Sequence, residues 1–276
     1  MGTAELTAPQ RRRYVPVRRR IRLSELWTGW RVTWMVAVRD MRIKYKQSLL
    51  GPVWLLLQPI GMLIGVVVAF AGITTVDTGG VPYLVFALVG VTIWAYFQLT
   101  LSTAVPAMIS NATLVRRSAC PRVALVTGAL VANLPTLGLL TIVTVALAIV
   151  LNGPRVEMVL LPFLLALAFV FLWGPALLLS AIAARFRDAV AAIPLVLQAG
   201  MFVSPVGYAT SSADGTLAVV LALNPLSGII DAWRWSLLGS PPSVLALVLA
   251  GVWTVLLTVA GWRVFGRLET EFADFL

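Results

Sequence analysis

Three cations that recur along one short segment are the residues best suited to bind another molecule. Arg39, Arg42 and Lys46 are spaced three and four residues apart, so a helix would place them on one stripe. The neighbouring stripe is apolar and contains Trp34, Val38, Met41, Tyr45 and Leu49. Such a helix, expected over residues 31–50, is typical of one lying at a membrane surface with its cations toward phosphates. These cations could anchor the helix to lipid, or they could contact a substrate or partner.

The sequence contains none of the common catalytic or nucleotide-binding motifs. Histidine is absent and Cys120 is the single cysteine, which excludes His-dependent triads and multi-cysteine zinc sites, so we expect no metal. Neither Lys44 nor Lys46, the two lysines, follows a glycine, so there is no GxxxxGK[ST] loop to hold nucleotide phosphates. We expect no catalytic residue and no cofactor in this chain. Any active transport must draw its energy from another subunit.

The elements that position these residues are predicted to be membrane spans. Hydrophobic types make up 60% of the 276 residues and charged types only 12%, about half the proportion usual in soluble domains. Six runs of 25 to 38 residues contain no Asp, Glu, Lys or Arg, and a helix needs about 20 apolar residues to cross a bilayer. The sequence therefore predicts an all-α polytopic membrane protein with six transmembrane helices. The first run contains Gly61 and Gly65, a pair that permits close helix contact.

Predicted boundaries divide the chain into four parts. Residues 1–22 form a basic tail, 23–51 hold the amphipathic interfacial helix, 52–265 hold the six spans and 266–276 form a C-terminal tail. The spans are expected near 52–73, 82–108, 123–151, 158–184, 189–208 and 244–262. Segment 209–240 is rich in polar residues, and its apolar stretch at 217–223 is too short to span. We expect short helices that re-enter the outer leaflet as a gate, with an ordinary outer loop as the alternative.

The basic residues predict the orientation of the chain. Twelve of the 21 Lys and Arg precede the first span, and seven more fall in the loops and tail on the same side. Only Arg155 and Arg234 remain on the other side, so both termini are expected to be cytoplasmic. Most of the net charge of +10 lies on this one side, where it would face an anionic inner leaflet. We therefore expect contact with membrane lipids and no nucleic acid. The predicted spans contain no charged residue, which argues against a proton- or sodium-coupled carrier.

Several motifs resemble a known family. Residues 39–59, RDMRIKYKQSLLGPVWLLLQP, resemble the first motif in the membrane subunits of ABC-2 type polysaccharide exporters. These permeases export O-antigen, capsule, teichoic acid and related lipid-linked glycans. Further matches follow in chain order over residues 25–276: Gly90 with Trp94, the terminal PR of 116–122, 185–188, LNP at 223–225 and FGRLETEFAD at 265–274.

This resemblance implies a bacterial inner or plasma membrane channel of two identical permease chains on two cytoplasmic ABC ATPases, which would bind ATP and magnesium. It assigns Arg39, Arg42, Lys44 and Lys46 to a helix at the substrate entrance. It also assigns six residues to two loops that couple to the ATPase. These are Arg116, Arg117, Arg122, Arg185, Arg187 and Asp188. It assigns to the outer gate Asn224, Pro225, Asp231, Trp233 and Arg234.

The substrate implied by the resemblance is a glycan linked through pyrophosphate to a polyprenyl lipid. Basic side chains at the entrance would bind the pyrophosphate by charge-assisted hydrogen bonds. Aromatic faces that could stack on sugar rings along the channel belong to Trp54, Trp94, Tyr96, Phe97, Trp173, Phe202 and Tyr208. Aromatic residues also gather at membrane interfaces without any substrate role. Efflux of a drug or small lipid by the same kind of permease, an intramembrane lipid-modifying enzyme and a membrane scaffold are the alternatives.

Overall fold

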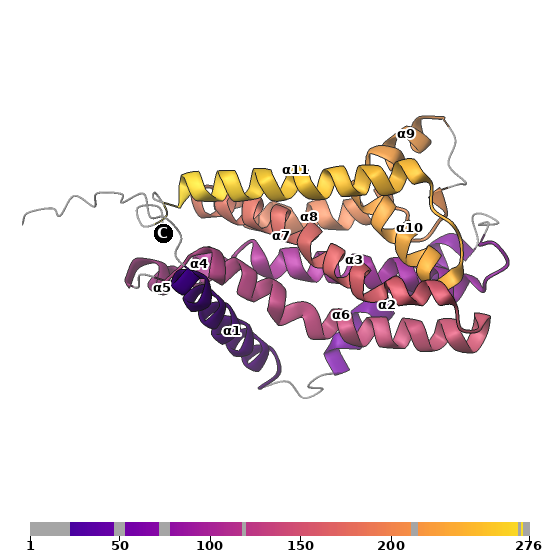
Figure 1. The fold of residues 1–276 in the computed structure, drawn as a ribbon, viewed down its shortest axis with the longest axis horizontal. Coiled ribbons are helices and arrows are strands. Elements are labelled where there is room, and N and C mark those ends of the chain that lie inside the picture. The colour runs from indigo at the N-terminus through magenta and orange to yellow at the C-terminus, as the bar shows by residue number, and fades with distance from the viewer. Residues whose placement is uncertain are drawn as a thin grey trace, which may run out of the picture.

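The computed structural model describes residues 23–46, 53–71, 78–117, 120–210, 215–269 and 272. These residues form helices and no strand, which confirms the all-α prediction. Figure 1 shows long helices running side by side between two ends, with α4, α5 and the C-terminal end of α11 at one end and α9 and α10 at the other. The helices are α1 Leu23–Lys46, α2 Trp54–Ala71, α3 Tyr83–Ala104, α4 Ala107–Ser110, α5 Ala112–Arg117, α6 Val123–Asn152, the 3-10 helix η2 Val156–Leu160, α7 Leu161–Arg185, α8 Asp188–Val203, α9 Gly215–Leu223, α10 Pro225–Leu238 and α11 Val244–Leu268.

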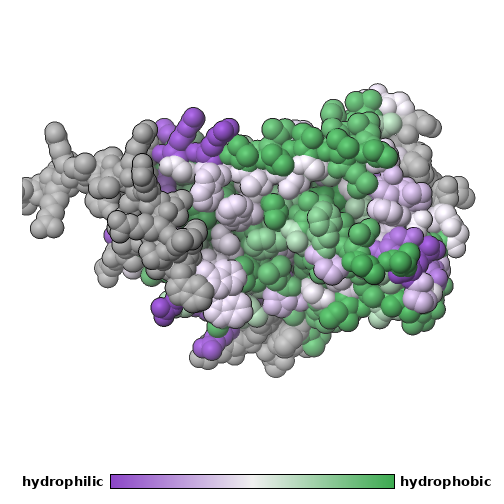
Figure 2. All heavy atoms as spheres, in the orientation of Figure 1, coloured by the Kyte–Doolittle hydropathy of each residue, from purple (hydrophilic) through white to green (hydrophobic). Residues whose placement is uncertain are grey.

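Four of the described helical segments are long and apolar enough to cross a membrane: α3, α6, η2 continued by α7, and α11. They coincide with four of the six predicted spans, and α11 extends beyond the predicted end at Trp262 to Leu268. The other two predicted spans correspond to α2 and α8, which are apolar but shorter. In Figure 2 a hydrophobic surface covers the middle of the bundle, and hydrophilic residues gather toward its two ends. The chain is therefore a multi-pass membrane protein by length, composition and surface.

The core of the molecule is built around α3, whose residues from Val85 to Tyr96 are all buried. This helix packs against α2, α6, α7, α8 and α10. A hydrogen bond of 2.8 Å joins the hydroxyls of Thr92 and Thr144 and links α3 to α6 in its buried interior. Because α3 is surrounded by five other helices, its side chains from Val85 to Tyr96 contact protein rather than lipid.

The helix α1 packs on α6 through a face that the sequence pattern did not indicate. Thr33, Val36 and Ala37 are buried, whereas Trp34 from the predicted apolar stripe is 55% exposed. The reason lies in α6, where Gly128 lets the helices approach: a Cβ atom there would lie 2.7 Å from a methyl carbon of Val36. The helix begins at Leu23, where the predicted segment 23–51 begins, and therefore extends before the helical pattern seen at 31–50; residues 47–50 lie outside the described part. Its apolar outer face remains suited to a membrane surface.

Candidate substrate entrance and outer segment

A cavity of about 270 Å³ lies where α1 meets three helices of the bundle. Its walls come from α1, α2, α3 and α6 and consist of Lys44, Trp54, Leu55, Gln58, Pro59, Ala95, Leu99 and Thr136. Lys44 is the one charged residue among them. Most of the lining is apolar, so the cavity combines one cation with a hydrophobic wall.

Lys44 is held in place by a chain of polar side chains. Its ammonium donates a hydrogen bond of 3.3 Å to the amide oxygen of Asn133. The Asn133 amide nitrogen donates in turn to the Thr103 hydroxyl at 2.8 Å and to the Ala129 carbonyl at 2.9 Å. Part of the Lys44 side chain is exposed, and the burial of the remainder lowers the pKa of Lys44 below its ordinary value. An anion beside the ammonium would offset that desolvation.

The cavity also contains an unpartnered hydroxyl. Thr136 is 2% exposed, and its oxygen has no hydrogen-bond partner in the structure. Thr136 lies one helical turn beyond Asn133 on α6. Asn133 itself is about 15 Å along the helix from its first residue, Val123. Because Thr136 lines the same cavity as Lys44, its hydroxyl could be a second donor to a ligand with anionic oxygens.

Two other predicted entrance cations, Arg39 and Arg42, do not line the cavity. Arg39 donates two hydrogen bonds, of 2.7 and 3.0 Å, to the carboxylate of Asp40. Arg42 is exposed, and the side chain of Lys46 lies outside the described part. Of the three entrance cations whose side chains the structure describes, Lys44 alone lines the cavity. The spacing argument had placed Arg39, Arg42 and Lys46 together and left Lys44 out, whereas the family resemblance included it.

The predicted channel aromatics differ in how far they are exposed. Trp94 and Tyr96 are 2% and 0% exposed, because α3 is the central helix, so neither ring offers a face to a sugar in this conformation. Phe97 packs against Trp94 with ring centroids 5.4 Å apart. In contrast, Trp54 on α2 and Phe202 on α8 are 52% and 61% exposed. The remaining two are half-buried: Trp173 beside Trp262, and Tyr208 beside Phe70.

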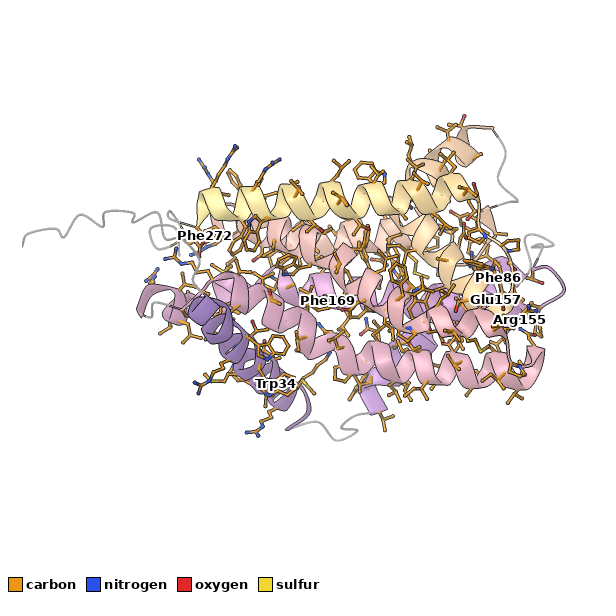
Figure 3. The ribbon with its side chains drawn as sticks, in the orientation of Figure 1. Trp34, Phe86, Arg155, Glu157, Phe169 and Phe272 are labelled. Atoms are coloured by element: carbon orange, nitrogen blue, oxygen red, sulfur yellow. The ribbon has the colours of Figure 1, made fainter. Side chains whose placement is uncertain are left out.

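The helix α10 is held in place by one buried arginine. Arg234 on α10 is 2% exposed, and its guanidinium donates to the carbonyls of Val206 at 2.9 Å and Tyr208 at 3.1 Å. The Asp231 carboxylate lies 3.7 Å away, and the Phe86 ring centroid lies 3.8 Å away. Phe86 marks the start of α3 at this end of the bundle (Figure 3). Arg234 thereby joins α10, the turn after α8, and α3.

Burial shifts the pKa values of Asp231 and Arg234 in opposite directions. Desolvation lowers the pKa of Arg234 to about 10, although Asp231 opposes the shift. Desolvation raises the pKa of Asp231, against the effects of Arg234 and of a 3.1 Å hydrogen bond from Thr210. The neighbouring Trp233 is fully buried. These residues, predicted for an outer gate, form a packed polar anchor in this conformation.

The LNP motif at 223–225 begins α10. The side-chain oxygen of Asn224 accepts a hydrogen bond from the Leu226 backbone N–H at 2.9 Å, and Pro225 occupies the first helical position. The Asn224 amide also donates to the Ser204 hydroxyl at 3.0 Å. The motif therefore caps α10 and ties it to the end of α8.

The predicted coupling residues lie on α5, before α6 and between α7 and α8. Arg116, Arg187 and Asp188 are exposed, whereas the Arg117 side chain lies outside the described part. The Arg185 guanidinium lies 5.6 Å from the centroid of the Phe186 ring. Arg122 is partly buried, and its guanidinium donates to the Glu269 carbonyl, which ties the start of α6 to the end of α11. Docking of an ATPase at these loops stays a prediction.

Sequence reasoning missed Asn133, Thr136 and Gln58. It searched the spans for charged residues, but these three are neutral. Asn133 stands in the apolar stretch VANLPTLG, and a side-chain amide inside a predicted span was a signal that could have found it.

Comparison with known proteins agrees with this architecture. The ABC-2 type transporter family matches residues 31–238, which is most of the chain. Two relatives are O-antigen export system permease proteins RfbA. The one from Klebsiella pneumoniae is 22% identical over 88% of this chain and 93% of its own length, and the one from Myxococcus xanthus is 25% identical over 86% and 92%. The chain belongs to the ABC-2 type transporter family, and the resemblance seen in its sequence is confirmed.

Proposed function

We propose that this chain is the channel-forming subunit of an ATP-driven exporter of polysaccharide carried on a polyprenyl pyrophosphate. Family membership and the export function named for its relatives support the general part of the proposal. The observation that carries the specific part is the Lys44 cavity, where a cation and an unpartnered hydroxyl are set in an apolar wall. A lipid pyrophosphate combines anionic oxygens with a hydrocarbon tail, so it matches both parts of that lining.

The ATP-hydrolysing machinery is assigned to separate subunits. The chain has no phosphate-binding loop, and membership of the family implies an ABC ATPase partner. Exposed basic residues on α5 and beside α8, including Arg116 and Arg187, offer a docking surface at one end of the bundle. Both termini would then be cytoplasmic, in a bacterial plasma membrane, with α10 on the outer side. Nucleotide binding would drive the channel between two states only if it favours one of them.

We propose that a second copy of the chain packs on the exposed face of α2. Cβ atoms built at Gly61 and Gly65 would meet nothing within 4 Å, and Leu57, Ile64 and Val68 on the same side are exposed. Small residues on an open helix face allow close approach of a partner helix. The short helix α8 is exposed along much of its length too, including Phe202. We propose that α2 and α8 of two copies border the channel, where Trp54 and Phe202 would meet the sugars.

The test compares Lys44→Met with Arg31→Gln, which removes an exposed cation from the same helix. Each variant is purified with its ATPase, and ATP hydrolysis is followed as farnesyl pyrophosphate is added. We expect Lys44→Met to need roughly tenfold more pyrophosphate for half-maximal stimulation, because a charge-assisted contact is lost. The Arg31→Gln complex should match the unmodified one. Equal responses of Lys44→Met and wild type would contradict the proposal, and stimulation by farnesol alone would favour efflux of a small lipid.

A further inference from the structure

A second hollow lies on the outside of the bundle, between α7 and α11. It encloses about 480 Å³ and is lined by Trp173, Thr258, Val259, Trp262 and Arg263. We call it the α7–α11 groove. It is separate from the Lys44 cavity, whose lining comes from α1, α2, α3 and α6.

Two indole rings that pack against each other line this groove. The centroids of Trp173 and Trp262 are 5.6 Å apart, with 43° between their planes. The Trp173 ring is held in place, because its N–H donates to the Thr127 hydroxyl of α6 at 2.9 Å. Below the rings the helices cross closely, since a Cβ atom at Gly261 would collide with the Gly174 carbonyl. The groove is thus a shaped feature of packed helices.

The position of Arg263 indicates where the groove lies in the membrane. Residues 244–262 contain no charge and, at 19 residues, extend about 28 Å, close to the thickness of the hydrocarbon core. Arg263 is the next residue and the first cation at that end. In Figure 2 a hydrophilic cluster at the C-terminal end of α11 adjoins the hydrophobic surface. Arg263 therefore stands at the level of lipid phosphates, with the two indoles just beneath it.

The lining selects an amphiphilic ligand. The Thr258 hydroxyl donates to the Val170 carbonyl at 3.4 Å, and the Trp173 N–H is bound to Thr127. Arg263 is then the main polar group that the groove offers, so a sugar with many hydroxyls would leave most of them without partners. A single anionic headgroup followed by an acyl chain matches one cation above an apolar slot.

We propose that the α7–α11 groove binds one anionic phospholipid, with its phosphate on Arg263 and an acyl chain lying against Val259 and the paired rings of Trp173 and Trp262. This inference requires only that α11 spans a membrane and is independent of the substrate exported. It also gives Trp173, which the sequence had placed on a channel wall, a role on the lipid-facing side of the bundle. The lipid would brace the crossing of α7 and α11.

The experiment uses full-length protein in a neutral detergent, with phosphatidylglycerol added and retained lipid counted by native mass spectrometry. We expect Arg263→Gln to weaken binding of phosphatidylglycerol roughly tenfold, because the charge-assisted contact to phosphate is lost. Val259→Phe, which fills the slot and leaves every charge in place, should weaken it similarly. Arg31→Gln, an exposed cation on α1, is the matched control and should bind as wild type does.

Three results would overturn the proposal. Unchanged binding in Val259→Phe would show that the slot holds no chain, even where Arg263→Gln fails to fold. An equal loss in Arg31→Gln would show only general attraction of anionic lipid to a basic end. Equal retention of phosphatidylcholine and phosphatidylglycerol by wild type would remove the role of Arg263.

Discussion

Removing Arg234 should strongly destabilise the packing of α10 on the turn after α8. The change Arg234→Met deletes the two hydrogen bonds to Val206 and Tyr208 and leaves the Asp231 carboxylate buried without its counter-ion. Breaking one side of a buried pair costs about 3–5 kcal/mol, because the remaining charge stays desolvated. At about 2–4 °C per kcal/mol, the thermal midpoint in detergent should fall by about 6–20 °C.

A double-mutant cycle separates the charge from the packing. If the unpaired carboxylate causes most of the loss, Asp231→Asn combined with Arg234→Met should recover at least about 1 kcal/mol relative to Arg234→Met alone. The Asn side chain can still accept from Thr210, so that hydrogen bond serves as an internal control. A double variant as unstable as the single one would refute the reasoning, since Asp231 would then not couple to Arg234.

The same pair predicts a pH dependence. Burial raises the pKa of Asp231 in the folded chain, while Arg234 lowers it, so Arg234→Met should raise that pKa further. For a group with a raised folded pKa, stability is present at low pH and is lost as pH rises through the folded value. The deficit of Arg234→Met against wild type should therefore shrink from about pH 7 toward about pH 4. A deficit independent of pH would show that Asp231 stays ionised in the variant.

Three further changes probe the rest of the structure. Gly90→Val should cost about 1–3 kcal/mol in thermal unfolding, because its Cβ would collide with the Val206 carbonyl, whereas Gly251→Ala, with open space around it, should cost nothing. Asn224→Ala should cost about 1 kcal/mol through loss of the α10 cap, and Asn224→Asp should keep it, so equal midpoints for the two would contradict the capping role. The pair Arg116→Glu with Arg117→Glu should weaken co-purification of the ATPase while membrane insertion stays intact, and undiminished association would exclude that loop as the docking site.

The fold was predictable where one physical signal dominates. Runs without charge located α3, α6, α7 and α11 to within a few residues, because hydrocarbon excludes charge and demands closed helices. The same signal also located α2 and α8 in the sequence, although these helices are shorter than the runs that contain them. The length of a charge-free run depends on where the next charged residue stands in the sequence. The length of a helix depends on packing and on helix-breaking residues, so the two lengths need not agree.

The candidate site was less predictable because it depends on side-chain direction between helices. Spacing placed Arg39, Arg42 and Lys46 on one stripe, but Arg39 pairs with Asp40, and Lys44 reaches the cavity. Lys44 does so because Gly128 allows α1 to pack closely on α6 and because the Asn133 amide oxygen accepts a hydrogen bond from the Lys44 ammonium. Neither contact is local in sequence. Likewise, Trp94 and Tyr96 were predicted to line the channel but are covered by the helices around α3.

The central position of α3 affects how the chain must be assembled. A ribosome completes α3 before it makes α6, α7, α8 and α10, four of the five helices that surround it. Until then Thr92 and its neighbours face lipid or the insertion machinery instead of their native partners such as Thr144. The nascent chain therefore has a window during synthesis in which its future interior is bare. Insertion factors that shelter polar helices should matter most at that stage, and slowed translation just after α3 should expose the chain to quality-control proteases.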